Sequence, residues 1–234
     1  MLSMKTIGIV GGLSPESTVL YYSNIIEEYR RKCRNEEYPE IIIYSVNFGK
    51  FTRLMERGKF KEAADIIVKA IKALHKAGAD FAIISANTPH IAFNYIASQS
   101  PIPLISIIDS LAEELKRNSI GRIGLLGTKF TLTHGFYVEG LRKHGIKAIV
   151  PDLKDVETAN RIIYDELTKG IVKDSSRKML LKIIGKLVKK GAEAIALACT
   201  ELPLILKENM VNVKLYDTVR IHSIKALEYA LSTS

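Results

Sequence analysis

One cysteine stands where a reactive thiol would be useful. Cys199 ends the apolar stretch "AIALAC" and precedes Thr200 and Glu201, which add a hydroxyl and a carboxylate. If a helix begins there, its free backbone N–H groups and its dipole lower the pKa of the thiol and make thiolate accessible. The pattern predicts a catalytic thiol, with a small buried core cysteine as the alternative. Cys33 lies on a helical stripe amid basic residues and is expected to be structural.

A second polar turn, "SANTPH", follows the apolar run "DFAII". Asn87 and Thr88 place an amide and a hydroxyl at the end of a predicted buried strand, directly after Ala86. His90 in the same turn and His222 in "DTVRIH" are expected to orient other groups of a site.

A glycine-rich turn, "GGLSPES", follows the first apolar run "KTIGIV". It is neither the G-x-G-x-x-G of dinucleotide-binding proteins nor a phosphate-binding loop, and the next strand ends in Asn47 instead of an acidic residue that would hold a ribose. Ser14 as cap and Pro15 in the first helical turn predict backbone N–H groups that hold a carboxylate or phosphate. A tight, well-capped turn is the plainer alternative, and the two are compatible.

Composition and charge argue against several classes of protein. The net charge of +9 is scattered, and the one dense basic run, residues 29–34, is expected to be the last turn of a helix and not a nucleic-acid surface. No C-x-x-C, H-x-x-H or H-E-x-x-H pattern occurs, so no metal site is expected. No signal peptide or membrane-spanning run is visible, which favours a cytoplasmic protein without membrane partners. Scarce Gln with abundant Lys and Glu hints at a thermophilic source.

Apolar strands alternate with amphipathic helices along nearly the whole chain, which predicts an α/β fold with mainly parallel sheets. Four polar turns follow predicted strands: "GGLSPES", "SANTPH", "GTKFTLT" and "CTELP". They should converge at the carboxyl ends of the sheets, where open α/β sheets bind ligands. Residues 15–33 are predicted to form a helix, because residues recur along one stripe at three- and four-residue steps: Val19, Tyr22, Ile26, Tyr29 and Cys33.

An internal repeat links the turn at Ala86 with the turn at Cys199. Aligning Gly78 with Gly191 places Ala86 on Cys199, and "TIGIVGG" matches "RIGLLGT" at a similar offset. The repeat predicts two homologous lobes that face each other across a cleft. We expect residues 1–103 with about 216–234 to form the N-terminal lobe and residues 104–215 the C-terminal lobe.

The ordered motifs "GGLSPEST..YY", "SVNF", "ANTPH", "GLLGT..T", "IIYDEL..G" and "CTELP" resemble the aspartate/glutamate racemase family over nearly the whole chain. The resemblance implies two pseudo-symmetric αβα, Rossmann-like domains with the active site in the cleft between them, and usually a homodimer. It also implies an amino-acid substrate, such as aspartate or glutamate, and no pyridoxal phosphate or other cofactor. Racemisation removes a proton from one face of Cα and delivers another to the opposite face, so two acid–base groups must flank the substrate.

The resemblance also implies roles for individual residues. Cys199 matches the catalytic cysteine of the second lobe, and Asn47 stands where relatives often have Asp. The positions expected to contact substrate are Ser14, Asn47, Asn87, Thr88, Thr128, Thr131 and Thr200. Supporting roles are expected for His90, Glu201 and His222.

Two positions depart from the family pattern. Ala86 occupies the place of the first catalytic cysteine and has no proton to give. In relatives a lysine contacts the distal carboxylate of the substrate, and the corresponding position in this chain falls near Thr158. Three interpretations follow: a racemase in which another group or water serves the Ala86 face, a one-cysteine enzyme that works on one face and resembles arylmalonate decarboxylase, and a catalytically silent amino-acid or dicarboxylate-binding protein.

Overall fold

The computed structural model describes residues 4–33 and 35–232, and the chain forms two compact units. Unit 1 comprises Met1–Ile107 and Val219–Ser234, and unit 2 comprises Ile108–Thr218. The chain therefore passes from one unit to the other twice. The basic run at residues 29–34 ends at Arg34, which lies outside the described residues.

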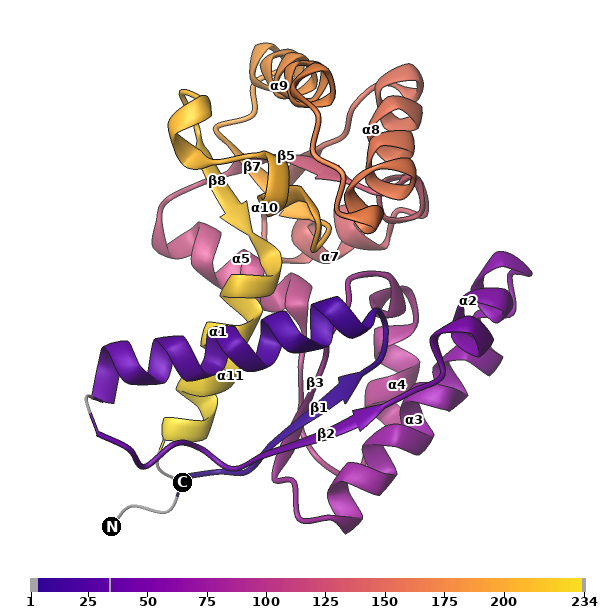
Figure 1. Cartoon of the computed structure of the whole chain (residues 1–234), viewed down its shortest axis with the longest axis vertical. Helices are drawn as coiled ribbons and strands as arrows, with labels where there is room; N and C mark the ends of the chain where they lie inside the picture. The colour runs from indigo at the N-terminus through magenta and orange to yellow at the C-terminus, as the bar shows by residue number, and fades with distance from the viewer. Residues whose placement is uncertain (1–3, 34, 233–234) are drawn as a thin grey trace. The chain divides into compact units, whose positions relative to one another are not determined.

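Unit 1 is built on a parallel four-stranded sheet in the order β2-β1-β3-β4 (Figure 1). Its strands are β1 (Ile7–Gly11), β2 (Ile41–Ser45), β3 (Phe81–Ile84) and β4 (Leu104–Ile105). Its helices are α1 (Pro15–Cys33), α2 (Phe48–Glu56), α3 (Phe60–Lys76), the 3₁₀ helix η1 (Thr88–Ala92), α4 (Phe93–Gln99) and α11 (Thr218–Leu231).

Helices cover both faces of this sheet. Tyr21 and Ile25 of α1 and Leu227 of α11 join the side chains of β1 and β3 in one fully buried cluster. On the other face α3 approaches closely because residue 8 is glycine: a Cβ there would lie 2.9 Å from the carbonyl oxygen of Phe81 and 3.3 Å from Cδ1 of Leu74. Burial on both faces explains why the strands read as continuous apolar runs.

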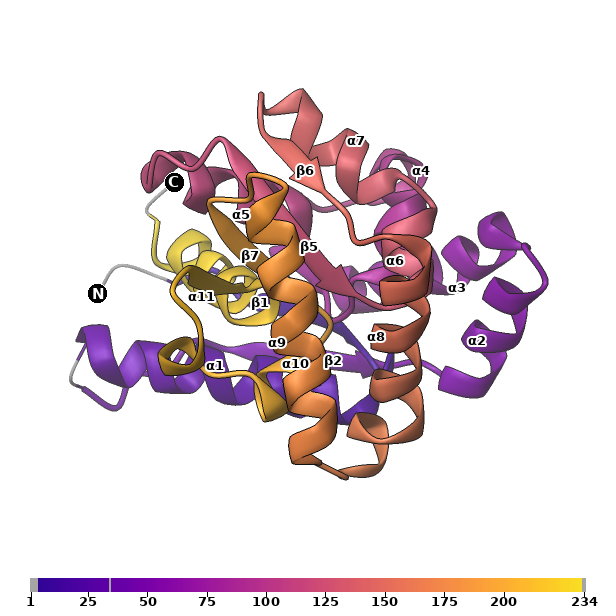
Figure 2. The same ribbon diagram turned by 90° about the horizontal axis from the view of Figure 1, so that it is seen from above.

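Unit 2 repeats this design with a parallel sheet in the order β6-β5-β7-β8. Its strands are β5 (Arg122–Gly127), β6 (Lys147–Ile149), β7 (Ala194–Ala198) and β8 (Lys214–Asp217). Its helices are α5 (Ile107–Arg117), α6 (Lys129–Thr133), α7 (Phe136–Lys143), α8 (Leu153–Asp165), η2 (Leu167–Lys169), α9 (Asp174–Lys189), α10 (Leu202–Ile205) and η3 (Glu208–Met210). In Figure 2, β5 and β7 lie between α8 and α9 on one side and α5 and α7 on the other. The predicted α/β class with parallel sheets is confirmed.

The predicted helix forms as α1, but its stripe of Val19, Tyr22, Ile26, Tyr29 and Cys33 is only partly buried. Val19 and Tyr22 are 64% and 46% exposed. The face that packs inward instead carries Ser17, Thr18, Tyr21, Ile25, Glu28 and Tyr29. Both faces of this helix carry apolar residues at helical spacing, and polar groups on the inner face find hydrogen-bond partners, so periodicity alone did not distinguish them.

In the described part of the chain, no helix combines the length and apolar character needed to cross a bilayer.

Candidate active site

In unit 2, two of the predicted site turns leave the same edge of the sheet. Gly127 at the end of β5 pairs with Ala198 at the end of β7 in parallel register. Thr128 directly follows Gly127 and Cys199 directly follows Ala198, so the two residues leave neighbouring strands at the same level. A Cβ on Gly127 would lie 3.0 Å from the carbonyl oxygen of Ala198, so glycine permits this close approach. Thr128 caps α6: its hydroxyl accepts a hydrogen bond from the backbone N–H of Thr131 at 3.3 Å and lies 3.1 Å from the Thr131 hydroxyl.

Cys199 lies directly against the Glu201 carboxylate. Its Sγ donates a hydrogen bond to Oε2 of Glu201 at 2.9 Å, and the Thr200 hydroxyl donates to the same oxygen at 2.6 Å. The thiol is 8% exposed. The structure thus brings Cys199, Thr200 and Glu201 together as one polar group at the end of β7.

The expected lowering of the Cys199 pKa is wrong, because the structure indicates a raised pKa. Burial, followed by the negative charge of Glu201, raises the pKa of Cys199 well above its usual value, although backbone N–H groups of Thr200 and Glu201 oppose the rise. The helix that follows, α10, has only four residues, so its dipole is weak. The resting thiol is therefore protonated. It must give up this proton before the sulfur can act as a base.

In unit 1, three turns leave the corresponding edge, because Gly11 pairs with Ser45 and Val10 pairs with Ile84. Ser14 accepts a hydrogen bond from the backbone N–H of Ser17 at 3.2 Å, as expected for the cap of α1. Asn47 is exposed, and its side-chain oxygen accepts a hydrogen bond from the backbone N–H of Lys50 at 2.9 Å, which caps α2. These contacts show that both residues hold helix starts in addition to any ligand contact.

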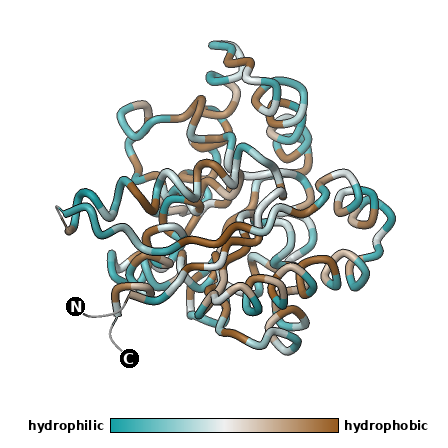
Figure 3. Tube along the Cα trace, turned by 60° about the horizontal axis from the view of Figure 1, so that its bottom comes forward, coloured by the Kyte–Doolittle hydropathy of each residue, from teal (hydrophilic) through white to brown (hydrophobic). Residues whose placement is uncertain are grey.

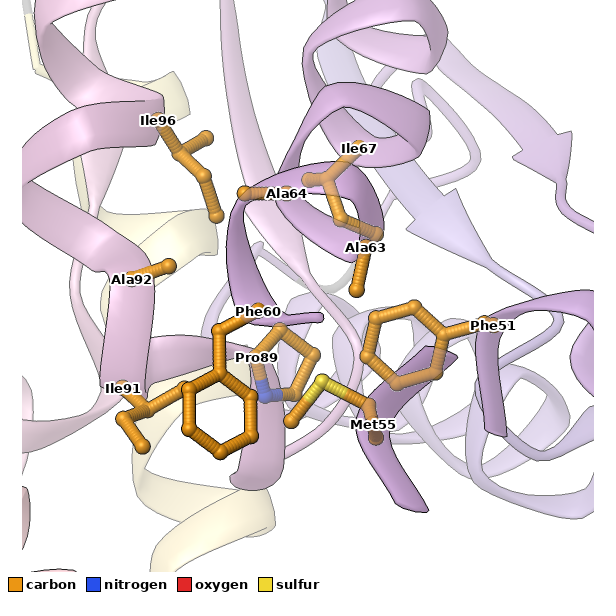
Figure 4. Close-up of a pocket in the computed structure, with 10 residues that line it drawn as sticks. All are labelled: Phe51, Met55, Phe60, Ala63, Ala64, Ile67, Pro89, Ile91, Ala92 and Ile96. Atoms are coloured by element: carbon orange, nitrogen blue, oxygen red, sulfur yellow. The ribbon is translucent and has the colours of Figure 1, made fainter. Parts of the chain in front are cut away.

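His90 holds the backbone of the turn after β3 in place through hydrogen bonds. Ala86, which is 8% exposed, is followed in the chain by Asn87, the N-cap of the 3₁₀ helix η1, and by Thr88, its first residue. Asn87 is buried and Thr88 is partly buried. Ile107 donates its backbone N–H to Nε2 of His90 at 3.2 Å, so the ring proton lies on Nδ1, which donates to the Ala86 carbonyl at 3.0 Å. Hydrophobic contacts also anchor η1: Figure 4 shows Pro89 facing Phe60 and Met55, and the space between these side chains is too small for a water molecule.

A second buried histidine continues this network. His222 donates from Nε2 to the carbonyl of Ile105 at 2.9 Å, so its Nδ1 accepts a hydrogen bond from the Tyr21 hydroxyl at 2.8 Å. Its ring centroid lies 6.1 Å from that of His90. Burial lowers the pKa of His90 from 6.5 to about 3, with His222 adding to the effect, and burial lowers the pKa of His222 from 6.5 to about 4. The lowered pKa values favour neutral rings at physiological pH, and both nitrogens of each ring are hydrogen-bonded within the protein, which suits the rings to orient backbone groups.

A hydroxyl network in unit 1 escaped the sequence analysis. Ser17 donates to the carbonyl of Ser85 at 2.5 Å, and Ser85 donates to the carbonyl of Val10 at 3.0 Å. Thr18 accepts the backbone N–H of Gly12 at 2.8 Å and donates to the carbonyl of Ser14 at 3.0 Å. The network ties the glycine-rich turn to the residue before Ala86. In the sequence, the signal for this network is the adjacent pair Ser17 and Thr18, which lies one helical turn before Tyr21.

Among the described residues, no group of three or more His, Cys, Asp or Glu side chains could hold a metal ion. The Cys199 thiol and the Glu201 carboxylate share a hydrogen bond along which a proton can move. Hydroxyl, amide and backbone N–H groups at the strand ends are suited to bind a polar substrate.

Known proteins match the chain over almost all of its length. The Asp/Glu/Hydantoin racemase family model matches residues 10–226. The broad specificity amino-acid racemase RacX of Bacillus subtilis is 24% identical over 216 residues, which are 91% of this chain and 92% of that protein.

Solved structures agree. A Yersinia pestis protein assigned as an Asp/Glu racemase is 38% identical with a TM-score of 0.93, covering 98% of this chain and 100% of that one. An aspartate racemase homologue from Pyrococcus horikoshii is 40% identical with a TM-score of 0.88, at the same coverage. The resemblance drawn from the ordered motifs is confirmed: the chain belongs to the Asp/Glu/hydantoin racemase family.

Proposed function

We propose that this protein is a cofactor-independent amino-acid racemase that moves the Cα proton with Cys199. Family membership supports a racemase-type activity. The observation that carries the proposal is the hydrogen bond from the Cys199 thiol to Glu201 at the carboxyl edge of the unit 2 sheet. A thiol beside a carboxylate can lose its proton and regain it, as an acid–base catalyst must.

The proposed first step is a transfer of the thiol proton to Oε2 of Glu201. A bound amino acid carries an α-ammonium group, and its positive charge lowers the thiol pKa that burial and Glu201 raise. The thiolate then takes the proton from Cα, and the electron pair is delocalised into the substrate carboxylate. Hydroxyl and amide groups aimed at that carboxylate stabilise the enediolate-like intermediate. The same thiol returns a proton to complete exchange on its own face.

Inversion needs a proton donor on the opposite face of Cα. Relatives of this type carry a second cysteine at the position of Ala86, and an alanine methyl group has no exchangeable proton. We propose that water or another side chain serves this face, which predicts slow inversion beside faster exchange. Substrate contacts are proposed for Ser14, Asn47, Asn87, Thr88, Thr128, Thr131 and Thr200. Aspartate and glutamate are the first substrates to test, and a homodimer is the proposed active form.

A one-face enzyme is the second candidate, and the single site thiol favours it. Such an enzyme protonates an enediolate from the Cys199 side alone, as in a decarboxylation, and does not need a group at position 86. A catalytically silent amino-acid-binding protein is the third candidate. The pattern of proton exchange at Cα distinguishes the three.

The test is to incubate each standard amino acid, in both configurations, with the protein in deuterium oxide. A racemase incorporates deuterium at Cα of both enantiomers and drives optical rotation towards zero. A one-face enzyme labels one enantiomer only. If no amino acid is labelled although ligands raise the melting temperature, the protein binds without turnover.

A further inference from the structure

A buried hydroxyl group holds the end of the strand that carries Cys199. Thr218 directly follows β8, the strand that pairs with β7 on its outer side. Its side-chain hydroxyl donates a 3.0 Å hydrogen bond to the carbonyl oxygen of Leu197. Leu197 lies two residues before Cys199, and Thr218 is fully buried. This bond therefore fixes the backbone of β7 directly before the thiol.

A buried phenol of α7 completes the arrangement. Tyr137 is fully buried, and its hydroxyl is hydrogen-bonded to the Thr218 hydroxyl. Because Thr218 gives its one hydroxyl proton to Leu197, it accepts the proton of Tyr137. Burial raises the pKa of Tyr137, so the phenol keeps the proton that it donates. The interior strands are coloured as hydrophobic segments in Figure 3, and hydroxyls in such surroundings need partners within the protein.

Unit 1 carries a counterpart of this anchor. The repeat that aligns Ala86 with Cys199, followed across the paired strands β3–β4 and β7–β8, also aligns Ile107 with Thr218. These two residues are the first residues of α5 and α11, the helices that follow β4 and β8. Ile107 donates its backbone N–H to His90, which donates to the carbonyl of Ala86. In both units, the first residue of the departing helix therefore helps to hold the backbone at the site position.

The two units use different side chains for this task. Pro203 stands where the repeat places the counterpart of His90, so the imidazole of unit 1 has no equivalent in the turn after β7. The hydroxyls of Thr218 and Tyr137 supply the hydrogen bonds there instead. Because unrelated side chains hold equivalent parts of the backbone, the position of each turn is a feature that the protein maintains.

We propose that Thr218 and Tyr137 are positioning residues that keep the Cys199 thiol against the Glu201 carboxylate. Their part in a reaction rests on the proposed function, whereas the geometry that they hold does not. The thiol sulfur lies 2.9 Å from Oε2 of Glu201, so a small shift of the end of β7 breaks this contact.

The thiol and the carboxylate lie between two anchors of the backbone. After them, Leu202 is buried in the core of unit 2, and its N–H donates to the carbonyl of Cys199 at 3.3 Å. Before them, Thr218 holds Leu197. Glu201 is next to the second anchor and Cys199 is nearer the first, so loss of the first anchor moves the thiol relative to the carboxylate. A displacement of about 1 Å at a reacting group can cost about 100-fold in rate.

Thr218→Val and Tyr137→Phe test the anchor in a Cys33→Ser background, where Cys199 is the only thiol. The first variant removes the threonine hydroxyl and keeps the shape of the side chain, and the second removes only the phenolic hydroxyl. Each should shift the ultraviolet titration of the thiolate to lower pH by about one unit, because the charge of Glu201 no longer lies against the sulfur. Thr218→Ser keeps the hydroxyl and should titrate like the wild type.

Ser223→Ala is the matched control for stability. Ser223 is fully buried on the same helix as Thr218, and its hydroxyl donates to the carbonyl of Val219 at 2.8 Å, within α11. The control loses a buried hydroxyl, as Thr218→Val does, and should be destabilised in urea. It should leave the thiolate titration unchanged. A shift of the titration thus separates positioning of the thiol from a general loss of stability.

Exchange of the Cα proton gives a second measurement. With any amino acid that the wild type labels, Thr218→Val and Tyr137→Phe should exchange at least about tenfold more slowly. A folded variant of either residue that titrates like the wild type would overturn the proposal, and so would Thr218→Ser if it titrates like the valine variant. If Thr218→Val does not fold, as circular dichroism reports, Tyr137→Phe decides. If the wild type labels no amino acid, the proposed function fails, and the titration still decides whether these residues position the thiol.

Discussion

The Cys199 thiol donates a 2.9 Å hydrogen bond to Oε2 of Glu201, an oxygen that also accepts the Thr200 hydroxyl. In the resting protein this arrangement keeps the proton on sulfur. Because burial, and after it the carboxylate of Glu201, raises the pKa of the Cys199 thiol, the resting protein holds little thiolate. The reactivity of Cys199 is therefore expected to respond to any change in the charge of residue 201.

Glu201→Gln should lower the pKa of the Cys199 thiol. The amide keeps the shape of the side chain and removes the negative charge that opposes thiolate formation. The ultraviolet absorbance of thiolate, titrated in a Cys33→Ser background, should rise at lower pH than with Glu201 in place. Catalytic exchange should nevertheless fall, because the amide cannot accept the thiol proton. An unchanged titration curve would show that Glu201 does not control the thiol.

Cys199→Ala should abolish exchange at Cα, whatever the substrate. Cys33→Ser is the matched control: it removes the other thiol, on α1, and should leave exchange within about twofold of wild type. Proton magnetic resonance in deuterium oxide measures both variants. Full exchange in the Cys199 variant would exclude both enzymatic interpretations.

Ala86→Cys should raise two-way racemisation at least about tenfold, within the range that a positioned acid–base group supplies. The side chain enters a buried turn whose backbone His90 and Ser17 already hold, so its direction is set by the structure. Ala86→Ser is the control, since it adds similar bulk with a far weaker acid. Optical rotation with aspartate and with glutamate gives the rates. No gain over the serine variant would mean that position 86 does not serve the second face.

The two buried histidines should make the protein sensitive to mild acid. Their folded pKa values, about 3 for His90 and about 4 for His222, lie below the ordinary 6.5. Unfolding therefore takes up protons when the pH falls below 6.5, and stability that is complete above that pH is lost as it falls towards the folded values. At about pH 5 each histidine should cost about 2 kcal/mol, or about 4 kcal/mol together.

Urea unfolding at neutral pH and at about pH 5 measures this loss. The double variant His90→Asn, His222→Gln keeps an amide donor for the carbonyls of Ala86 and Ile105 but cannot be protonated. It should lose much less stability between the two pH values, even if it is less stable at neutral pH. An equal loss in both proteins would assign the acid sensitivity to other groups.

The sequence by itself determined the fold class and the location of the polar turns. Continuous apolar runs require strands that are buried on both faces, and residues such as Asn87 and Cys199 stand directly after those runs, so their place at the strand ends follows from order along the chain. The equal strand order of the two sheets reflects the repeat that aligns Ala86 with Cys199. Local order and composition suffice for such features.

Only the tertiary structure decided the features that depend on distant partners. Tyr21 meets His222 across 201 residues and Ser17 meets the Ser85 carbonyl across 68, and these contacts select the inner face of α1 over the apolar stripe of Val19 and Tyr22. The thiol pKa was likewise decided by burial and by the orientation of Glu201, neither of which spacing reveals. Helical periodicity reports which residues share a face, but desolvation and hydrogen bonding in the folded chain determine which face is buried.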